Sequence, residues 1–478
     1  MSDHTETADL VLRDIVDSSP MYALPAMPPR DFEPSDEPQP ILPPEFSDDA
    51  LALDFVRCGQ NFRSSHGIGW MVDDGIVWRR DDQLRRYDLA RSICREAASF
   101  AEDDGEGKRL ASARTVNAVL SLAQTDQRLV IPVDAWDCDA MVLNSPKGLV
   151  DLRTGQLAPR GVAYVTQAAR VSPVDAACPL WLRFIDQVFV GDRDLIEFMR
   201  RSLGYWLTGD RREQVLFFLY GLGANGKSVL TEFVQWLGGS YTIKLPANVL
   251  MQSKGDRHPT ELAQLRGKRL AVSSELEETS FFNESLIKEL TGDTTLTARF
   301  MRGDFFEFHM SQKHVIVGNF KPRLRGGDPA MARRMLLVPF MASFKGSARD
   351  PLMLDKLKAE APAILHWIVG GAMAWASEGL AVPESVRAAS ADYMADHDDL
   401  ALWMDECCER QGEGKASDLY SSFSMWKKAR GEHATSMTAW GSRLTSIPGV
   451  QKRNSNGVRY VGLRLTALEL AAVNESRR

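Results

Sequence analysis

The sequence predicts an α/β fold built on a mostly parallel sheet, and three observations lead to this prediction. Short, almost continuous apolar runs recur between residues 214 and 340, with helical patterns between them. Strands covered by helices on both faces have this composition, because neither face meets water. A glycine-rich segment directly follows the first run, and a basic helix–hairpin pattern lies near the end of the chain. We therefore expect a doubly wound core flanked by smaller units.

The charge is unevenly distributed along the 478 residues. A net charge of −7 by itself argues against a nucleic-acid-binding protein. The first 50 residues, however, hold twelve acids and two bases, a net −10, so the remainder is mildly basic at +3. Nine of the 23 prolines also lie there. We expect residues 1–45 to form a disordered acidic, proline-rich arm, because this composition buries too little apolar surface to offset chain entropy.

No segment is expected to cross a membrane. The longest nearly apolar stretch, residues 363–376, has 14 residues and includes His366, whereas a spanning helix needs about 20 apolar residues. The arm lacks the basic start and apolar run of a signal peptide. Six cysteines without CxxC spacing are expected to stay reduced. These features predict a cytoplasmic protein.

The region before the apolar runs is expected to be mixed α/β. A strand–turn–strand pattern covers residues 69–80, a helical pattern follows over 87–102, and turn residues within 136–157 indicate hairpins. Apolar residues recur on one helical face between 180 and 208, which predicts helix there. Residues 352–410 also have helical patterns.

The segment GLGANGKS matches the phosphate-binding pattern G-x-x-x-x-G-K-[ST]. It follows the strand predicted at 214–220 and begins a helix, which is the context that the motif requires. Glycines let successive N–H groups surround a phosphate at a helix N-terminus. We expect Lys227 to reach the β- and γ-phosphates and Ser228 to hold Mg²⁺, so ATP and Mg²⁺ are the predicted cofactors. The predicted ATP-binding residues are Gly221, Leu222, Gly223, Ala224, Asn225, Gly226, Lys227 and Ser228.

Polar residues stand at the ends of later apolar runs. Glu275 directly follows the second run and is the favoured acid for Mg²⁺ and the attacking water, with Glu277 as its companion. Asn319 ends the next run, where an amide suits contact with the γ-phosphate. Arg333 and Arg334 precede the last run, and one guanidinium is expected to reach a neighbouring subunit's nucleotide.

Together these motifs resemble those of the superfamily 3 helicases, which are AAA+ motors, and most closely those of the phage and plasmid primase-helicases related to the poxvirus primase-helicase. The resemblance covers roughly residues 55–470 and implies an AAA+ P-loop core preceded by an N-terminal α/β domain. The core segments that carry it are GLGANGKS, RGKRLAVSSELEE, LIKELTGDTTLTARFMRGDFFEFH and HVIVGNFKPRLRGGDPAMARRMLLVPF. Upstream it rests on NSPKGLVDLRTG and GYWLTGD.

The resemblance implies four catalytic residues. Lys227 holds the nucleotide, Glu275 is the Walker B acid that joins Ser228 at the metal, and Asn319 is the motif C sensor. Arg334 is the arginine finger, because it follows Asn319 by 15 residues, the spacing of the papillomavirus member. The neighbouring Arg333 stays open as the alternative, as does Glu277 for the acid.

The segment TARFMRGDFFEFH predicts a β-hairpin with a basic tip around Arg302. In the superfamily this hairpin lines the channel of a hexamer and moves single-stranded DNA. A basic tip grips phosphates without reading sequence. The residues expected to contact DNA here are Lys288, Arg299 and Arg302.

The last 68 residues hold eleven bases and five acids, a net +6. A helical stretch at 438–445 precedes two strands around Asn456-Gly457, a strong hairpin signal. Helix followed by basic hairpin predicts a winged-helix-like unit, whose wing binds either DNA or a protein. The residues expected to meet a DNA backbone are Lys452, Arg453 and Arg459.

Five parts follow from these predictions. They are a disordered arm (1–45), an N-terminal domain of the phage/plasmid primase-helicase type (51–205), a superfamily 3 AAA+ ATPase core (206–345), a helical segment (346–410) and a winged-helix-like basic domain (411–478).

The predicted function is ATP-dependent unwinding of DNA, with single-stranded and forked DNA as substrates. The resemblance implies a homohexameric ring that moves 3′ to 5′ and replicates a phage, plasmid or other mobile element in a bacterial cytoplasm. We find no convincing polymerising site in residues 51–135, so priming is expected to need a separate primase. The alternative is an ATP-gated initiator or regulator that binds DNA without unwinding it. A small-molecule kinase would leave Glu275, Asn319 and Arg334 unexplained.

Overall fold

The computed structural model describes residues 42–478 except 253–258, 275–280, 302–303, 323, 325–327, 347–348, 397, 455–456 and 478. The acidic arm predicted for residues 1–45 therefore lies almost wholly outside the described residues. The same holds for Glu275, Glu277 and Arg302.

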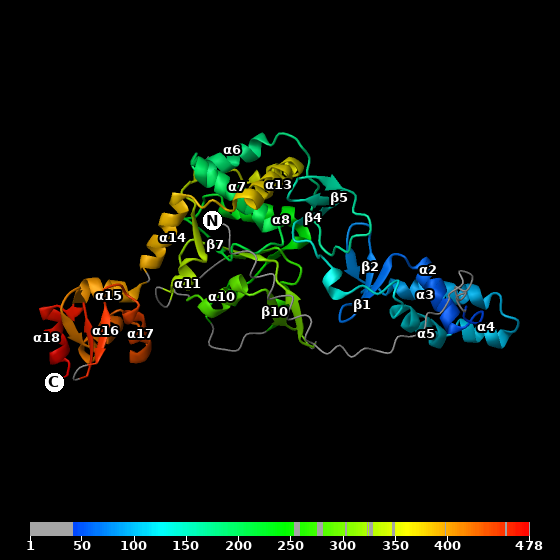
Figure 1. The fold of residues 1–478 in the computed structure, drawn as a ribbon. Helices are drawn as coiled ribbons and strands as arrows, with labels where there is room; N and C mark the ends of the chain where they lie inside the picture. The colour runs from blue at the N-terminus through cyan, green and yellow to red at the C-terminus, as the bar shows by residue number, and fades with distance from the viewer. Residues whose placement is uncertain are drawn as a thin grey trace, which may run out of the picture.

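A five-stranded sheet lies at the centre of the molecule, and every neighbouring pair in it is parallel (Figure 1). The α/β fold class is thus confirmed. Strand β12 is inserted between β7 and β9, so the carboxyl ends of these three strands meet at one edge. In spatial order the strands are β13 (Met335–Pro339), β7 (Leu216–Tyr220), β12 (Lys313–Gly318), β9 (Leu270–Ser274) and β8 (Thr242–Lys244). The three-residue β8 is too short to show as an apolar run.

Side chains of the strands alternate between two hydrophobic cores. On β7, Phe217 and Leu219 enter one core, whereas Leu216 and Phe218 enter the other. Helices cover both faces, which explains why the run is continuously apolar. On one side lie α6 (Pro179–Val188), α7 (Arg193–Leu207), α8 (Lys227–Gly238), α12 (Met353–Ala359) and α13 (Ala361–Glu378). On the other lie α9 (Pro259–Ala263), α10 (Glu284–Gly292), α11 (Pro329–Ala332) and α14 (Glu384–Asp396).

The helical stretch predicted over 180–208 is two helices, α6 and α7. Val190 and Gly191 between them have φ angles of 52° and 72°, which no α-helix contains. Asp192 then starts α7 by accepting a hydrogen bond from the Leu195 N–H at 3.0 Å. Both helices share one hydrophobic core with the sheet. The domain boundary predicted at residue 205 thus falls inside that core.

The N-terminal unit has its own core, in which Phe55 and Trp70 are buried. A three-stranded meander over residues 142–158 follows this unit in the chain and confirms the hairpins predicted within 136–157. The elements are α2 (Asp48–Cys58), β1 (Phe62–Ser65), β2 (Gly69–Asp73), β3 (Trp78–Arg80), α3 (Arg85–Ala98), α4 (Asp104–Leu110), α5 (Ala113–Gln124), β4 (Val142–Ser145), β5 (Gly148–Asp151) and β6 (Leu157–Ala158).

The C-terminal unit has the topology helix, strand, two helices and hairpin, with the three strands in the order β15-β17-β16. This is the winged-helix-like arrangement that the sequence predicts. Its separate core is centred on Trp403 and Trp440. The elements are α15 (Asp399–Cys407), β14 (Cys408–Glu409), β15 (Glu413–Lys415), α16 (Ala416–Ala429), α17 (Met437–Thr445), β16 (Gln451–Asn454), β17 (Val458–Val461), β18 (Arg464–Leu465) and α18 (Ala467–Glu475).

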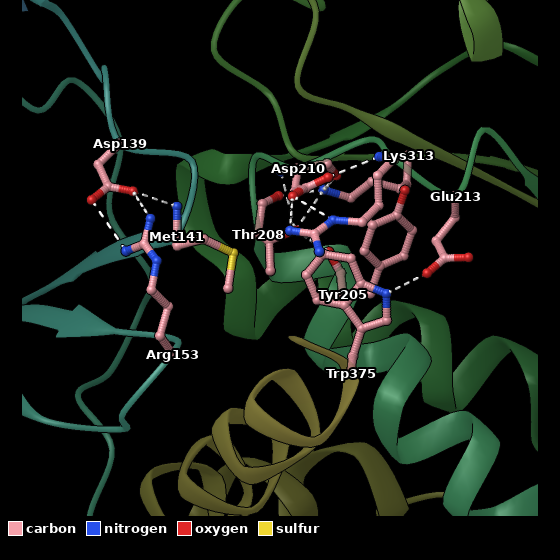
Figure 2. A network of polar contacts seen from close by, with 10 residues as sticks. Asp139, Met141, Arg153, Tyr205, Thr208, Asp210, Glu213, Lys313 and Trp375 are labelled. Atoms are coloured by element: carbon pink, nitrogen blue, oxygen red, sulfur yellow. Dashed lines mark hydrogen bonds and ion pairs between the residues drawn. The ribbon is translucent and has the colours of Figure 1, made fainter. Parts of the chain in front are cut away.

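Basic residues at the amino ends of the strands anchor the meander and the chain that leads into the sheet. The buried Lys313 donates to the Thr208 and Asp210 carbonyls, the latter at 3.3 Å (Figure 2). It also donates to the Ser311 carbonyl at 3.2 Å. Burial lowers the pKa of Lys313 well below its ordinary value, and two nearby arginine charges add to this effect. Arg269 at the start of β9 donates to the Leu207 and Val142 carbonyls at 2.8 and 2.7 Å.

Across the described ranges, no helix combines the length and the apolar content that a membrane crossing needs.

We predict that Gly371 cannot carry a side chain without loss of stability, because α7 and α13 cross closely at this residue. A Cβ atom on Gly371 would lie 2.1 Å from the Arg200 carbonyl oxygen, which is backbone and cannot move aside. Gly371→Ala should therefore destabilise the protein by about 1–3 kcal/mol in chemical denaturation. The matched control is Gly370→Ala, whose Cβ would meet only the mobile end of the Arg200 side chain at 2.6 Å. Equal losses from both variants would contradict this prediction.

Candidate nucleotide-binding site

The glycine-rich loop joins β7 to α8 in conformations that need its glycines. The φ angles of Gly221 and Gly226 are 151° and 88°. A Cβ atom on Gly226 would also lie 2.7 Å from Val188 Cγ2, so a side chain there is both strained and crowded. The loop ends at the N-terminus of α8, a helix of twelve residues. Backbone N–H groups and the helix dipole together favour an anion at this point.

The segment after β13 holds this loop in place. Asn225 is buried, and its Nδ2 donates to the Phe340 carbonyl at 3.0 Å. The Phe344 N–H donates to the Ala224 carbonyl at 2.6 Å. The sequence motif leaves position 225 unspecified, so nothing in it indicated that Asn225 fastens the loop to a distant segment.

Lys227 is a buried cation whose partners among the described residues are all neutral. Only 4% of the residue is exposed, and its Nζ donates to the Gly221 carbonyl at 2.7 Å. It also donates to the side-chain oxygens of Asn225 at 3.1 Å and Asn319 at 3.3 Å. Burial lowers the pKa of Lys227 to about 8. A desolvated ammonium without a carboxylate among its described partners fits a phosphate ligand.

The insertion of β12 beside β7 explains why Asn319 meets Lys227. Asn319 directly follows β12, and the loop directly follows β7, so parallel pairing of the two strands brings their ends together. The sequence separation of 92 residues disappears in the sheet. Two predicted site residues are therefore in direct contact.

A cavity of about 740 Å³ opens at this edge of the sheet, within the size range of ligand pockets. Lys227, Ser228 and Asn319 line it, together with Ser274 at the end of β9. The Ser228 hydroxyl and the Lys227 ammonium are the groups present that suit a magnesium–nucleotide complex. Glu275, the residue after Ser274, lies outside the described residues, so its predicted role stays a prediction.

The two adjacent arginines differ in exposure. Arg334 is only 9% exposed, and its guanidinium donates to Thr291 Oγ1 at 3.1 Å and to the Ala330 carbonyl at 2.8 Å. Arg333, one residue earlier, is exposed. The sequence alone does not distinguish the two, because the difference arises from how α10 packs beside α11.

Strands β10 (Thr295–Ala298) and β11 (Phe306–His309) pair antiparallel, which confirms the predicted hairpin. The side chains near its tip are more apolar than predicted, since Phe300, Met301 and Phe305 are all exposed. The Arg299 guanidinium lies over the Phe305 ring at 4.8 Å. Aromatic residues on both sides of Arg302 are visible in the sequence, but the residues predicted to contact DNA here are all basic.

Lys288 on α10 is already engaged. Its Nζ forms an ion pair with Asp328, the residue that caps α11. Burial acts to raise the pKa of Asp328, but hydrogen bonds from Lys288 and from the Ala330 N–H hold the pKa below its ordinary value. Contact between Lys288 and DNA would therefore compete with this ion pair.

The basic residues predicted on the wing lie on one hairpin. Lys452 and Arg453 are exposed on β16, and Arg459 faces Arg453 across the strand pair. Like charges opposite each other are unfavourable unless an anion lies between them. Arg459 has Glu413 at 4.0 Å as its acidic neighbour. The predicted turn residue Asn456 lies outside the described residues.

Two parts of the chain match known families. Residues 54–190 match the family described as D5 N terminal like. Residues 219–334, from the end of β7 to the arginine pair, match a family of unknown function, DUF5906.

Viral proteins also match parts of the chain. "Putative helicase 022R" of Frog virus 3 (isolate Goorha) is 25% identical over 283 residues, which is 53% of this chain and 28% of that protein. "Putative helicase L207/L206" of Acanthamoeba polyphaga mimivirus is 27% identical over 155 residues, which is 32% of this chain and 16% of that protein. Among solved structures, the apo NrS-1 C-terminal region covers 87% of this chain and 99% of its own length, at 10% identity and a TM-score of 0.49.

We predict that phosphate binding weakens as the pH rises through the pKa of Lys227. Below about pH 8 the ammonium is charged, whereas above it the free protein holds a neutral amine and must take up a proton to bind an anion. ADP affinity measured by calorimetry should fall by up to about tenfold per pH unit between pH 8 and 10. Lys227→Arg, which stays charged in this range, should remove that slope. The same slope in both proteins would show that another group titrates.

Proposed function

We propose that this chain, a member of the phage-type primase-helicase group that carries a D5 N-terminal-like domain, is an ATP-driven DNA helicase of superfamily 3. The viral relatives bear helicase names, but the matches span under a third of their length. Unwinding by this chain is therefore a proposal, and it rests first on the nucleotide site.

The observation that carries the proposal is the contact between Lys227 and Asn319. This contact connects the glycine-rich loop with the tip of the adjacent strand, where an amide suits the attacking water. Lys227 and Ser228 would hold the phosphates and Mg²⁺, and Glu275 would accept the proton of the water. ATP bound here would supply the phosphoanhydride bond whose hydrolysis drives movement.

The arginine pair supports a site completed by a second subunit. A guanidinium that reaches a neighbour's nucleotide must project from the surface, and Arg333 does so while Arg334 is bound inside its own subunit. We therefore favour Arg333 as the finger and assign Arg334, the residue first expected there, to positioning. Through Thr291, Arg334 also contacts α10, which leads into β10 of the hairpin.

Contact with DNA is proposed at the hairpin and the wing. Arg299 and Arg302 would bind phosphates, while Phe300 and Phe305 offer rings on which bases stack. Lys288 would join them only after leaving Asp328. On the wing, the proposed contacts are Lys452, Arg453 and Arg459.

The remaining features of the proposal come from the family. They are a hexameric ring, 3′ to 5′ movement, priming by a separate primase, and replication of a phage, plasmid or other mobile element in a bacterial cytoplasm. The exposed basic wing equally suits an ATP-gated initiator that binds DNA without separating its strands. This is the second candidate function.

Strand displacement on a forked duplex separates the two candidates. The wild-type protein should release the displaced strand when ATP and Mg²⁺ are present. Lys227→Ala should reduce both ATP hydrolysis and unwinding by at least about 100-fold, because it removes the charge that faces the phosphates. Lys108→Ala, an exposed lysine on α4, is the matched control and should behave as wild type. ATP-dependent DNA binding without displaced strand would favour the initiator.

We predict opposite phenotypes for the two arginines. Arg333→Ala should keep its thermal stability and bind ATP normally, yet lose most hydrolysis, since only the neighbour's site needs it. Arg334→Ala should lower the melting temperature, because it breaks two hydrogen bonds that join α10 and α11. Mixing Arg333→Ala with Lys227→Ala subunits should restore part of the hydrolysis at interfaces that combine an intact finger with an intact loop. No recovery on mixing would argue against action between subunits.

A further inference from the structure

We propose that α6 and the segment after β13 form the nucleoside end of the nucleotide site, and that the Gln187 side chain selects adenine. This inference rests on the proposed nucleotide binding and deepens it. Neither the phosphate-binding motif nor the strand-end residues include any part of these two segments.

The strand order sets the direction in which a nucleotide lies. Strands β12 and β9, which end near Asn319 and Ser274, lie on one side of β7. Strand β13 lies on its other side, and the chain leaving it passes the loop at Phe340 and Phe344. Because hydrolysis takes place beside Asn319, the terminal phosphate points toward β12. The nucleoside then lies on the β13 side.

Apolar side chains from α6 and from this segment meet at that end of the cavity. A Cβ atom on Gly226 would lie 3.6 Å from both Phe184 Cε2 and Phe344 Cε2, so both rings pack against the loop itself. Phe184 is buried and Phe344 is half-buried, and Met353 lines the same cavity. Rings and a thioether beside a phosphate site suit the face of a base.

Gln187 supplies the polar group at this end. It lies three residues after Phe184 on α6, hence on the same face, and it lines the cavity. The residue is exposed, and its side-chain amide has no hydrogen-bond partner within the described part of the chain. An amide offers one donor and one acceptor, which match the amino group and ring nitrogen of adenine. On the same edge, which carries N7 and the 6-substituent, guanine presents two adjacent acceptors, and an amide does not satisfy them.

The proposed nucleoside end lies partly in the N-terminal domain. Helix α6 lies within residues 54–190, the match to the D5 N-terminal-like family, whereas the phosphate loop lies within the match at 219–334. A nucleotide in this cavity would therefore contact both parts of the chain.

The test measures binding of ADP, GDP and tripolyphosphate to the full chain by calorimetry. Gln187→Ala should weaken ADP about 3- to 10-fold, the effect of one or two hydrogen bonds, and leave tripolyphosphate unchanged. Gln187→Glu offers only acceptors and so loses the donor that faces the ring nitrogen; it should weaken ADP and should not improve GDP, which presents two acceptors on this edge. Gln127→Ala, an exposed glutamine in the N-terminal unit, is the matched control and should bind all three as wild type does.

Failure of this inference is distinguishable from failure of the site. If Lys227→Ala leaves binding of all three probes unchanged, the phosphate site itself is wrong. If Lys227→Ala weakens them but both Gln187 variants bind ADP and GDP as wild type does, only the assignment of the nucleoside end is overturned. Hydrogen exchange gives a second readout, since ADP should protect the α6 amides and tripolyphosphate should not. Equal protection by the two probes would also overturn the assignment.

Discussion

The site depends on one buried ammonium that has no charged partner among the described residues. Lys227 bridges the phosphate loop and the tip of β12 through three neutral oxygens. Burying a cation in this way is unfavourable, and the lowered pKa expresses that cost. A bound phosphate would offset this cost by pairing with the ammonium. The desolvation that disfavours the charge in the empty site would therefore also strengthen its attraction for an anion. The parallel pairing of β7 and β12 makes this possible by holding the two polar ends in contact.

A second buried lysine, Lys313, has a structural role instead of facing the proposed ligand site. Lys313 begins β12, the strand that ends at Gly318, and at that opposite edge of the sheet it donates to three main-chain carbonyls. Its hydrogen-bonding capacity is thereby used within the chain. Arg269 does the same at the start of β9. One edge of the sheet thus anchors the preceding domain, and the other carries the proposed nucleotide site.

The elements beyond the sheet are connected to the site by side-chain contacts. Arg334 joins α11 to the end of α10, and Lys288 on α10 joins it to the cap of α11. Because α10 leads into the hairpin, these contacts link the surface that carries Arg333 to the proposed DNA-binding tip. On the other side of the sheet, α6 packs against the phosphate loop at Gly226. A nucleotide would therefore meet elements from well before and well after the motif that first indicates its presence.

The sequence by itself determined the strands with both faces buried, the phosphate loop, the hairpin and the winged-helix-like unit. Each of these depends on local order: apolar runs, glycine spacing, alternation and turn residues. Only the tertiary structure decided what depends on contacts between distant segments. It bound Arg334 in its own subunit while leaving Arg333 exposed, engaged Lys288 with Asp328, and divided the stretch from 180 to 208 into two helices of the sheet's core. It also placed Gln187 at the cavity. That placement depends on the order of the strands in the sheet, which no single segment of the sequence specifies.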